Sequence, residues 1–124
     1  GLRYIMNMYQ DRYEIPMFIV ENGFGYADQF EDGKIHDQNR IDYLKSHIEE
    51  MKKAIDEDGC DCLGYTVWGC IDPISFTTGE MKKRYGFIYV DRNNDGSGSY
   101  KRYKKDSFEW YKRIIETNGE DLDF

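Results

Sequence analysis

FIVENGFG, residues 18–25, sets a glutamate at the end of a short apolar run and then turns the chain at Asn22-Gly23. Met17 to Val20 are all apolar, which is typical of a parallel strand that is buried on both faces. In parallel α/β folds, catalytic residues gather at the carboxyl ends of the strands. The stretch therefore predicts a buried strand that presents Glu21 at the functional edge of a sheet. The alternative is that Glu21 only caps the strand or the loop.

The segments around this stretch alternate between helix and strand patterns. Residues 2–13 place apolar side chains at helical spacing, and Pro16 separates them from the apolar run. Residues 22–36 have the composition of a loop. Residues 37–56 again predict a helix, because one apolar stripe runs along an otherwise charged segment. The members of that stripe are Ile41, Leu44, Ile48, Met51 and Ile55.

The second half of the chain continues the alternation. Apolar runs at 62–70 and 86–90 predict two further strands. The sequence Asn-Asn-Asp-Gly at 93–96 is a turn signal of the kind found in hairpins. Buried strands that alternate with helices are typical of a parallel α/β fold.

A last helix is expected near the end of the chain. Asp106 and Glu109 have the spacing of a capping box, and Gly119 is placed to stop the helix. The tail from Glu120 onward is expected to fray. The apolar side of this helix is expected to consist of Phe108, Tyr111 and Ile115.

These elements do not make a complete sheet. Two parallel strands covered by three helices cannot close on themselves, and both strands would have open edges with apolar side chains. The chain therefore has the pattern of a slice of something larger. We expect residues 1–124 to be a segment of one domain and not an independent complete domain.

Composition narrows the classes of function. The chain has 124 residues, of which 40% are hydrophobic, so a folded core is expected. A net charge of −7 disfavours a nucleic-acid or membrane-surface partner, and no apolar run approaches the roughly 20 residues of a membrane span. Three cysteines without a visible secretory signal are typical of a reducing compartment, so a cytoplasmic location is expected.

Five stretches together resemble glycoside hydrolase family 1, the retaining β-glycosidases built on a (β/α)8 barrel. They are FIVENGFG, GLRYIMNMYQDRY before it, DYLKSHIEEMKKAIDEDGCDCLGYTVWGCID after it, then KRYGFIYVD and KKDSFEWYKRII. The resemblance implies that the chain is the C-terminal part of a TIM barrel, its last two βα units. It also implies that Glu21 is the carboxylate nucleophile at the end of barrel strand seven. Trp68, at the end of strand eight, would lie under the sugar.

The resemblance carries a mechanism with it. A retaining glycosidase uses two carboxyl groups roughly 5–5.5 Å apart, one as nucleophile and one as acid and base, and needs no cofactor. The family's acid/base glutamate lies in an Asn-Glu-Pro motif, which is absent from this sequence. We therefore expect the 124-residue chain to be inactive when alone.

The segment DPISFTTGEMKKRYGFIYVD, residues 72–91, indicates the substrate. In register with Trp68 and Asp72, the resemblance implies that Ser75 stands where ordinary β-glucosidases carry a glutamate for the sugar's 4- and 6-hydroxyls. Lys83 and Tyr85 share one face of an extended chain. An ammonium, a phenol and the Ser75 hydroxyl predict a phosphate clamp, a pattern that resembles the family's 6-phospho-β-glycosidases.

Phe76 distinguishes two substrate classes within that resemblance. The family's 6-phospho-β-galactosidases carry Trp at this place, so Phe favours a 6-phospho-β-glucoside as the substrate partner. A 6-phospho-β-galactosidase remains an alternative. A second alternative is a non-catalytic remnant or a phosphosugar-binding module. The open strand edges predict that the chain pairs with the rest of a barrel or with itself.

Two metal-like patterns do not qualify as sites. DRNNDG at 91–96 begins like a calcium loop, but its twelfth position is Arg102, where such a loop needs a bidentate glutamate. Cys60-x-Cys62 lacks two further ligands at metal spacing. The sequence therefore predicts no metal site.

Overall fold

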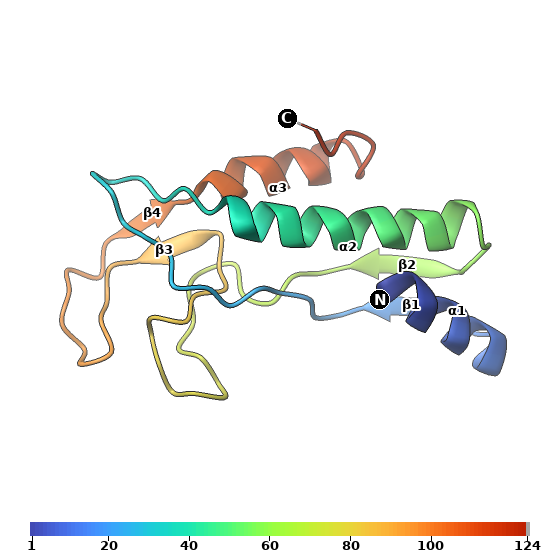
Figure 1. Cartoon of the computed structure of the whole chain (residues 1–124), viewed down its shortest axis with the longest axis horizontal. Coiled ribbons are helices and arrows are strands. Elements are labelled where there is room, and N and C mark those ends of the chain that lie inside the picture. The colour runs from blue at the N-terminus through green and yellow to red at the C-terminus, as the bar shows by residue number, and fades with distance from the viewer. Residues whose placement is uncertain (124) are drawn as a thin grey trace.

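The computed structural model describes residues 1–123. Its first four elements are two helices and two strands that alternate along the chain. Helix α1 spans Leu2–Tyr13, strand β1 Met17–Ile19, helix α2 Gln38–Asp56 and strand β2 Cys62–Tyr65. The bounds of the helices and of the first strand confirm the sequence prediction to within a residue or two. The prediction that this strand is buried on both faces is wrong, because Phe18 is 49% exposed. Figure 1 shows α2 running alongside β2, with β1 next to β2.

Strands β1 and β2 pair in parallel, and among residues 1–123 they make a two-stranded sheet. Phe18 pairs with Gly64, and a Cβ at residue 64 would lie 2.6 Å from the Phe18 ring. A side chain at residue 64 would therefore displace the Phe18 ring, which lies over the glycine of the neighbouring strand. The prediction of an incomplete sheet is confirmed for the described part of the chain.

Strand β2 is shorter than the apolar run 62–70 that predicted it. The chain leaves regular pairing after Tyr65, yet it stays beside the segment that follows β1. The Thr66 N–H donates to the Ile19 carbonyl and the Trp68 N–H to the Asn22 carbonyl, each at 2.8 Å. The two loops therefore lie together even though the strand has ended.

The predicted hairpin is present. Strand β3, Ile88–Val90, pairs antiparallel with strand β4, Arg102–Lys104. The connection between the two strands, residues 91–101, is longer than a tight turn, and the predicted turn at 93–96 lies within it. The Gly96 N–H donates to the Asn93 carbonyl at 3.0 Å, and Gly96 has a φ of 87°, which favours glycine.

Helix α3, Asp106–Glu116, begins differently from the prediction. No side chain of its own caps it, so the predicted capping box is wrong. Asp106 instead contacts the His36 ring at 2.7 Å. The cap comes from the residue just before α2, because the Asp37 carboxylate accepts from the Ser107 N–H at 2.9 Å. A contact across 70 residues replaces the local one.

The buried face of α3 is also rotated from the expected one. Ser107, Trp110 and Ile114 are buried, whereas Ile115 is 67% exposed. Phe108 and Tyr111 are only partly buried. The helix packs on α2 through Trp110 and Ile114, so its expected apolar side flanks the sheet edge instead. The predicted helix stop is confirmed, since the Gly119 N–H closes onto the Ile114 carbonyl at 2.8 Å.

The tail is docked, so the prediction that it frays from Glu120 is wrong for residues 120–123. Leu122 is 9% exposed, and its carbonyl accepts from the Trp110 indole N–H at 3.2 Å. The Lys52 ammonium holds the Gly119 carbonyl. Phe124 lies outside the described residues.

Two apolar clusters hold the elements together. The larger one joins α2, α3 and the segment before β3, and it has seven buried members. The smaller one joins α1 to the end of α2 through Met6, Ala54 and Cys60. In residues 1–123 no helix is both long enough and apolar enough to span a membrane. The members of the larger cluster are Ile41, Leu44, Ile48, Phe87, Trp110, Ile114 and Leu122.

Candidate active site

The loops that follow β1 and β2 meet around Asn22. Its carbonyl accepts from the Trp68 N–H at 2.8 Å, and its side-chain oxygen accepts from the Tyr65 hydroxyl at 2.7 Å. Burial raises the pKa of Tyr65, which keeps that hydroxyl protonated and able to donate. Asn22 is thus fixed by both its backbone and its side chain, and Glu21 is presented beside it. Sequence reasoning treated Asn22 only as a turn residue.

A hollow of about 530 Å³ lies at this end of the sheet. It is lined by Glu21, Trp68, Phe76 and Tyr85, four of the six residues that the sequence predicted for the site. Glu21 is exposed and Trp68 is 37% exposed, so both are open to a ligand. The other lining residues are Asn22, Gly23 and Thr77, of which Thr77 had no signal in the sequence.

The two glycines of the FIVENGFG stretch allow the walls of the hollow to close. A Cβ at Gly23 would lie 3.0 Å from the Trp68 Cβ. A Cβ at Gly25 would lie 2.6 Å from the Tyr85 ring and 2.8 Å from the Lys83 Cε. A side chain at 25 would have to displace Tyr85 and Lys83, and one at 23 would crowd Trp68, so glycine lets these groups approach the loop this closely.

Lys83 and Tyr85 therefore stand side by side on the backbone of the loop that carries Glu21. The Lys83 ammonium lies 5.7 Å from the centre of the Tyr85 ring. Arg84, between them, points to the opposite side and is 4% exposed. The prediction that Lys83 and Tyr85 share one face of an extended segment is confirmed.

Ser75 has a different setting from the other predicted residues. It is 1% exposed and lies within the turn at 75–80, where the Gly79 N–H donates to its carbonyl at 2.8 Å. Its hydroxyl accepts weakly from the Thr78 N–H at 3.4 Å. It does not line the hollow, whereas its neighbour Phe76 is 93% exposed at the edge. The structure thus joins Lys83 to Tyr85 beside the hollow, but neither Lys83 nor Ser75 lines it.

Behind the hollow lies a buried charge chain, in which three carboxylates alternate with three cations. Arg40 contacts Asp37 and, at 3.0 Å, Asp28. The Lys105 ammonium then lies 2.6 Å from Asp28 and 2.7 Å from Asp72. Arg84 completes the chain at 2.9 Å from Asp72. The order along the buried charge chain is Asp37, Arg40, Asp28, Lys105, Asp72 and Arg84.

Lys105 is the central member of the buried charge chain. It sits at the start of α3 and joins Asp28, after β1, to Asp72, after β2. Burial, together with Arg40, lowers the pKa of Lys105, and the two carboxylates oppose that effect. The buried carboxylate of Asp72 holds Lys105, Arg84 and the Gly86 N–H, so it orients the loop.

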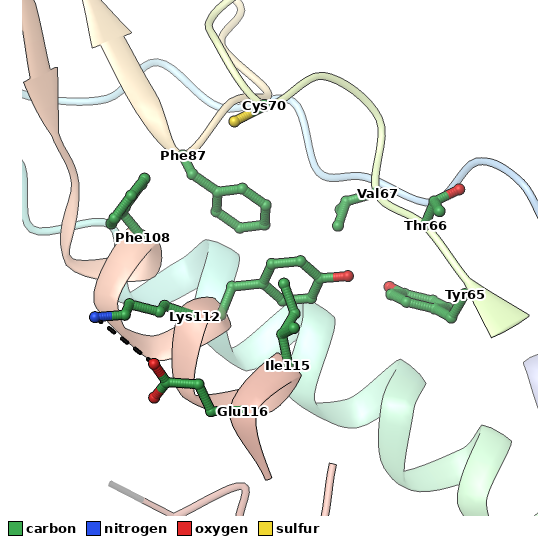
Figure 2. Close-up of a pocket in the computed structure, with 10 residues that line it drawn as sticks. Tyr65, Thr66, Val67, Cys70, Phe87, Phe108, Lys112, Ile115 and Glu116 are labelled. Atoms are coloured by element: carbon green, nitrogen blue, oxygen red, sulfur yellow. Dashed lines mark ion pairs between the residues drawn. The ribbon is translucent and has the colours of Figure 1, made fainter. Parts of the chain in front are cut away.

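A second hollow of about 650 Å³ flanks the free edge of β2, and Figure 2 shows the side chains around it. Its polar rim includes the Lys112–Glu116 ion pair, at 3.7 Å. Aromatic and aliphatic side chains make up most of the remaining lining, and among the described residues around it no acidic and basic side chains point together into the hollow. It is therefore a packing surface and not a reaction site. Its lining residues are Tyr65, Thr66, Val67, Cys70, Phe87, Phe108, Tyr111, Lys112, Ile115 and Glu116.

Metal chemistry has no evident ligand set in the described part of the chain. Among residues 1–123, no group of three or more His, Cys, Asp or Glu side chains is arranged to hold an ion. The three cysteines are free.

Comparison with known proteins places this geometry in a family. The profile described as "Glycosyl hydrolase family 1" matches residues 1–120. The chain is 70% identical to "Aryl-phospho-beta-D-glucosidase BglA" of Bacillus subtilis (strain 168), over 98% of the chain and 26% of that relative. It is 55% identical to "6-phospho-beta-glucosidase AscB" of Escherichia coli (strain K12), over 99% of the chain and 26% of that relative.

Solved structures agree with the sequence comparison. The chain superimposes on "Family 1 b-glucosidase from Thermotoga maritima" with a TM-score of 0.86 and 39% sequence identity, over 98% of this chain and 26% of that one. A curated relative from Thermotoga maritima, "Beta-glucosidase A", is 41% identical, over 96% of the chain and 26% of that relative. The chain thus spans about a quarter of the length of the curated relatives it matches.

Proposed function

Because the chain belongs to glycosyl hydrolase family 1, and its fold is a partial piece of that family's TIM barrel, we propose that it serves a retaining 6-phospho-β-glucosidase. In this proposal the chain supplies the nucleophile and the phosphate side of the pocket. The observation that carries the proposal is the placement of Lys83 and Tyr85 directly on Gly25, in the loop that presents Glu21.

Glu21 is the nucleophile of the proposed reaction. Its carboxylate attacks the anomeric carbon and forms a glycosyl ester, while a second carboxylic acid protonates the leaving glycosidic oxygen. Water, deprotonated by that second group, then cleaves the ester, so the product keeps the β configuration. The second group belongs to the part of the barrel that this chain does not span. Two carboxyl groups supply all the chemistry, so the mechanism requires no cofactor.

Trp68 and the phosphate clamp position the sugar. The Trp68 ring forms a wall of the hollow against which the apolar C–H face of a pyranose can pack. Lys83 supplies a full positive charge and Tyr85 a hydroxyl to a 6-phosphate. Ser75 does not line the hollow, so its proposed role is the carboxylate that it lacks: a longer glutamate side chain here, next to Phe76 at the edge of the hollow, would bring negative charge toward the phosphate. The relatives at 70% and 55% identity are named phospho-β-glucosidases, which supports this substrate class.

A chimera tests the proposal. Residues 1–123 replace the matched quarter of the 70% identical Bacillus subtilis relative, to give the chimeric barrel. It should release nitrophenol from p-nitrophenyl 6-phospho-β-glucoside, and a 2-fluoro-glucoside 6-phosphate should label Glu21. A label on another residue, or a folded chimera that binds this substrate without turnover, would contradict the proposal. The second result would favour the non-catalytic phosphosugar-binding module.

The same chimera separates the two phosphosugar classes. Phe76 reaches the edge of the hollow and is the residue that favours the glucoside. The gluco-configured 6-phosphate should therefore be hydrolysed faster than its galacto-configured isomer. A preference for the galacto isomer would identify the site as that of a 6-phospho-β-galactosidase.

We also propose that the chain is not a complete domain and that its partner is the rest of the barrel. Phe18, Val20 and Leu63 in and beside the two strands are 49–67% exposed, so the sheet lacks cover on one face. Alone, the chain should self-associate through these apolar strand edges. A compact monomer at high concentration, with a sharp cooperative melt, would contradict this when measured by light scattering and calorimetry. Phosphorylated substrates and three free cysteines favour a cytoplasmic site of action.

A further inference from the structure

Arg84 separates the two residues of the proposed phosphate clamp, and all of its polar contacts face away from the hollow. Its guanidinium donates to the Asp72 carboxylate at 2.9 Å and to the carbonyls of Val90 and Arg92 at 2.7 and 2.9 Å. It also stacks on the Tyr89 ring, with its central carbon 3.8 Å from the ring centre. A forked, planar cation can make all of these contacts at once, and a lysine cannot.

The backbone of Arg84 is held as firmly as its side chain. Its N–H donates to the Tyr26 carbonyl, and its carbonyl accepts from the Tyr26 N–H, both at 2.9 Å. The same carbonyl accepts from the Arg40 guanidinium at 2.8 Å. Residues 83–85 are therefore fixed against the loop that follows β1.

The other side of this segment is pressed against the loop that follows β2. The Gly86 N–H donates to Asp72 at 3.0 Å, and a Cβ on Gly86 would lie 2.6 Å from the Asp72 nitrogen. The Phe87 N–H donates to the Cys70 carbonyl at 2.8 Å. Residues 84–87 thus join the loop of Glu21 to the loop of Trp68.

We propose that Arg84 is a positioning residue for substrate phosphate. In an extended chain, neighbouring side chains point to opposite faces, so a buried anchor at 84 sets where Lys83 and Tyr85 stand over Gly25. The loops of Glu21 and Trp68 are also joined directly through the hydrogen bonds of Asn22, which do not involve Arg84. Loss of the anchor should therefore impair recognition of the phosphate more than recognition of the sugar.

This inference rests on the proposed function, and the test uses the chimeric barrel with phosphorylated and plain nitrophenyl glucosides. Arg84→Met should lower the ratio of kcat/KM for the phosphorylated over the plain substrate by about tenfold, mainly through KM. Arg84→Lys keeps the charge but loses the forked guanidinium, so its ratio should fall between those of the unmodified chimera and Arg84→Met. The ratio does not depend on how much enzyme is folded, so loss of stability alone does not change it.

Two further variants make the result decisive. Ile48→Ala empties a site in the core between α2 and α3, away from the hollow, and should lower Tm while leaving the ratio within about twofold. If Arg84→Met does not fold, Arg84→Met with Asp72→Asn removes both charges of the pair and takes its place. An unchanged ratio in the Arg84 variants, alongside a lower ratio in Lys83→Ala, would overturn the inference and leave the proposed function standing. An unchanged ratio in Lys83→Ala as well would overturn both.

Discussion

The carboxyl end of the β1–β2 sheet and the turn that leads into β2 use the same kinds of charged side chain in different settings. At the carboxyl end, the buried charge chain lies behind the hollow, and its side chains are almost fully shielded from water. In the turn that leads into β2, Arg3 of α1 pairs with Glu57 and Asp58 on the surface.

The difference follows from what each end has to do. Buried charges need close partners, and such partners fix the geometry of the groups that carry them. Exposed pairs are screened by water and add little to stability. In barrels of this kind, function gathers at the carboxyl ends of the strands and the opposite face serves stability. The comparison predicts large effects at the carboxyl end and small ones at the turn.

The largest effect is expected from Glu21→Gln in the chimeric barrel. It keeps the size of the side chain but removes the proposed nucleophile, so kcat should fall by at least about 10⁴-fold. Tm should stay unchanged, because the exposed carboxylate is outside the buried charge chain. Added azide should restore some turnover in Glu21→Ala, with inverted product, since the small anion can attack from the side of the missing carboxylate. Full activity in Glu21→Gln would remove Glu21 from the mechanism.

The next largest effect concerns the buried charge chain, and the quantity measured is the free energy of unfolding. Arg40→Met leaves Asp37 and Asp28 without their shared cation in a region closed to water. Breaking a buried pair from one side typically costs about 3–5 kcal/mol, measured by denaturant unfolding. The matched control is Arg12→Met on the exposed face of α1, expected to change stability by less than about 0.5 kcal/mol. Equal losses in both variants would show that burial does not distinguish these charges.

Lys83→Ala should act on phosphorylated substrates alone. Removing the cation from a partly desolvated phosphate should cost about 2–5 kcal/mol, on the order of a 30-fold or greater loss in kcat/KM. Lys82→Ala is the control, because Lys82 is exposed and pairs with Glu80 outside the hollow. Ser75→Glu together with Lys83→Ala should shift preference toward plain β-glucosides. If both substrates weaken equally in Lys83→Ala, the residue is structural.

The smallest effect is expected from Asp58. Hydrogen bonds from Arg3 and Asn7 lower the pKa of Asp58 to about 2. A lowered carboxyl pKa adds stability that is complete above about pH 4 and is lost as the pH falls toward about 2. Asp58→Asn should therefore lower Tm by about 1–2 °C at neutral pH, and the difference from wild type should vanish near pH 2. Asp11→Asn, on the same helix as Arg3, is the control, and activity should not change in either variant.

Local patterns were enough to predict much of the fold. The helical spacing of 2–13 and 37–56, the apolar run that became β1 and the stop at Gly119 all depend on neighbours a few residues apart. The convergence of Glu21 and Trp68 on one hollow was also predicted, since parallel strands bring their carboxyl ends to one edge, whereas Phe76 and Tyr85 were named only through the family resemblance.

Other features depend on contacts that no local pattern contains. The capping of α3 by Asp37, the choice of Trp110 over Ile115 for its buried face and the docking of Leu122 each require a segment far away in the sequence. The position of Ser75 inside its own turn, outside the hollow, belongs to the same class.

The buried charge chain shows most clearly why such features cannot be predicted from local sequence. Asp28, Arg40 and Lys105 look like ordinary loop and surface residues in the sequence, because periodicity reports only which way the local backbone faces. Whether a charge can be buried depends on whether an opposite charge arrives within hydrogen-bond distance. Lys105 meets partners that lie 33 and 77 residues away, at Asp72 and Asp28. The amino-acid sequence therefore predicted the helices and the first strand and singled out Glu21 as the proposed nucleophile, whereas only the tertiary structure decided which charges are buried together beside the site.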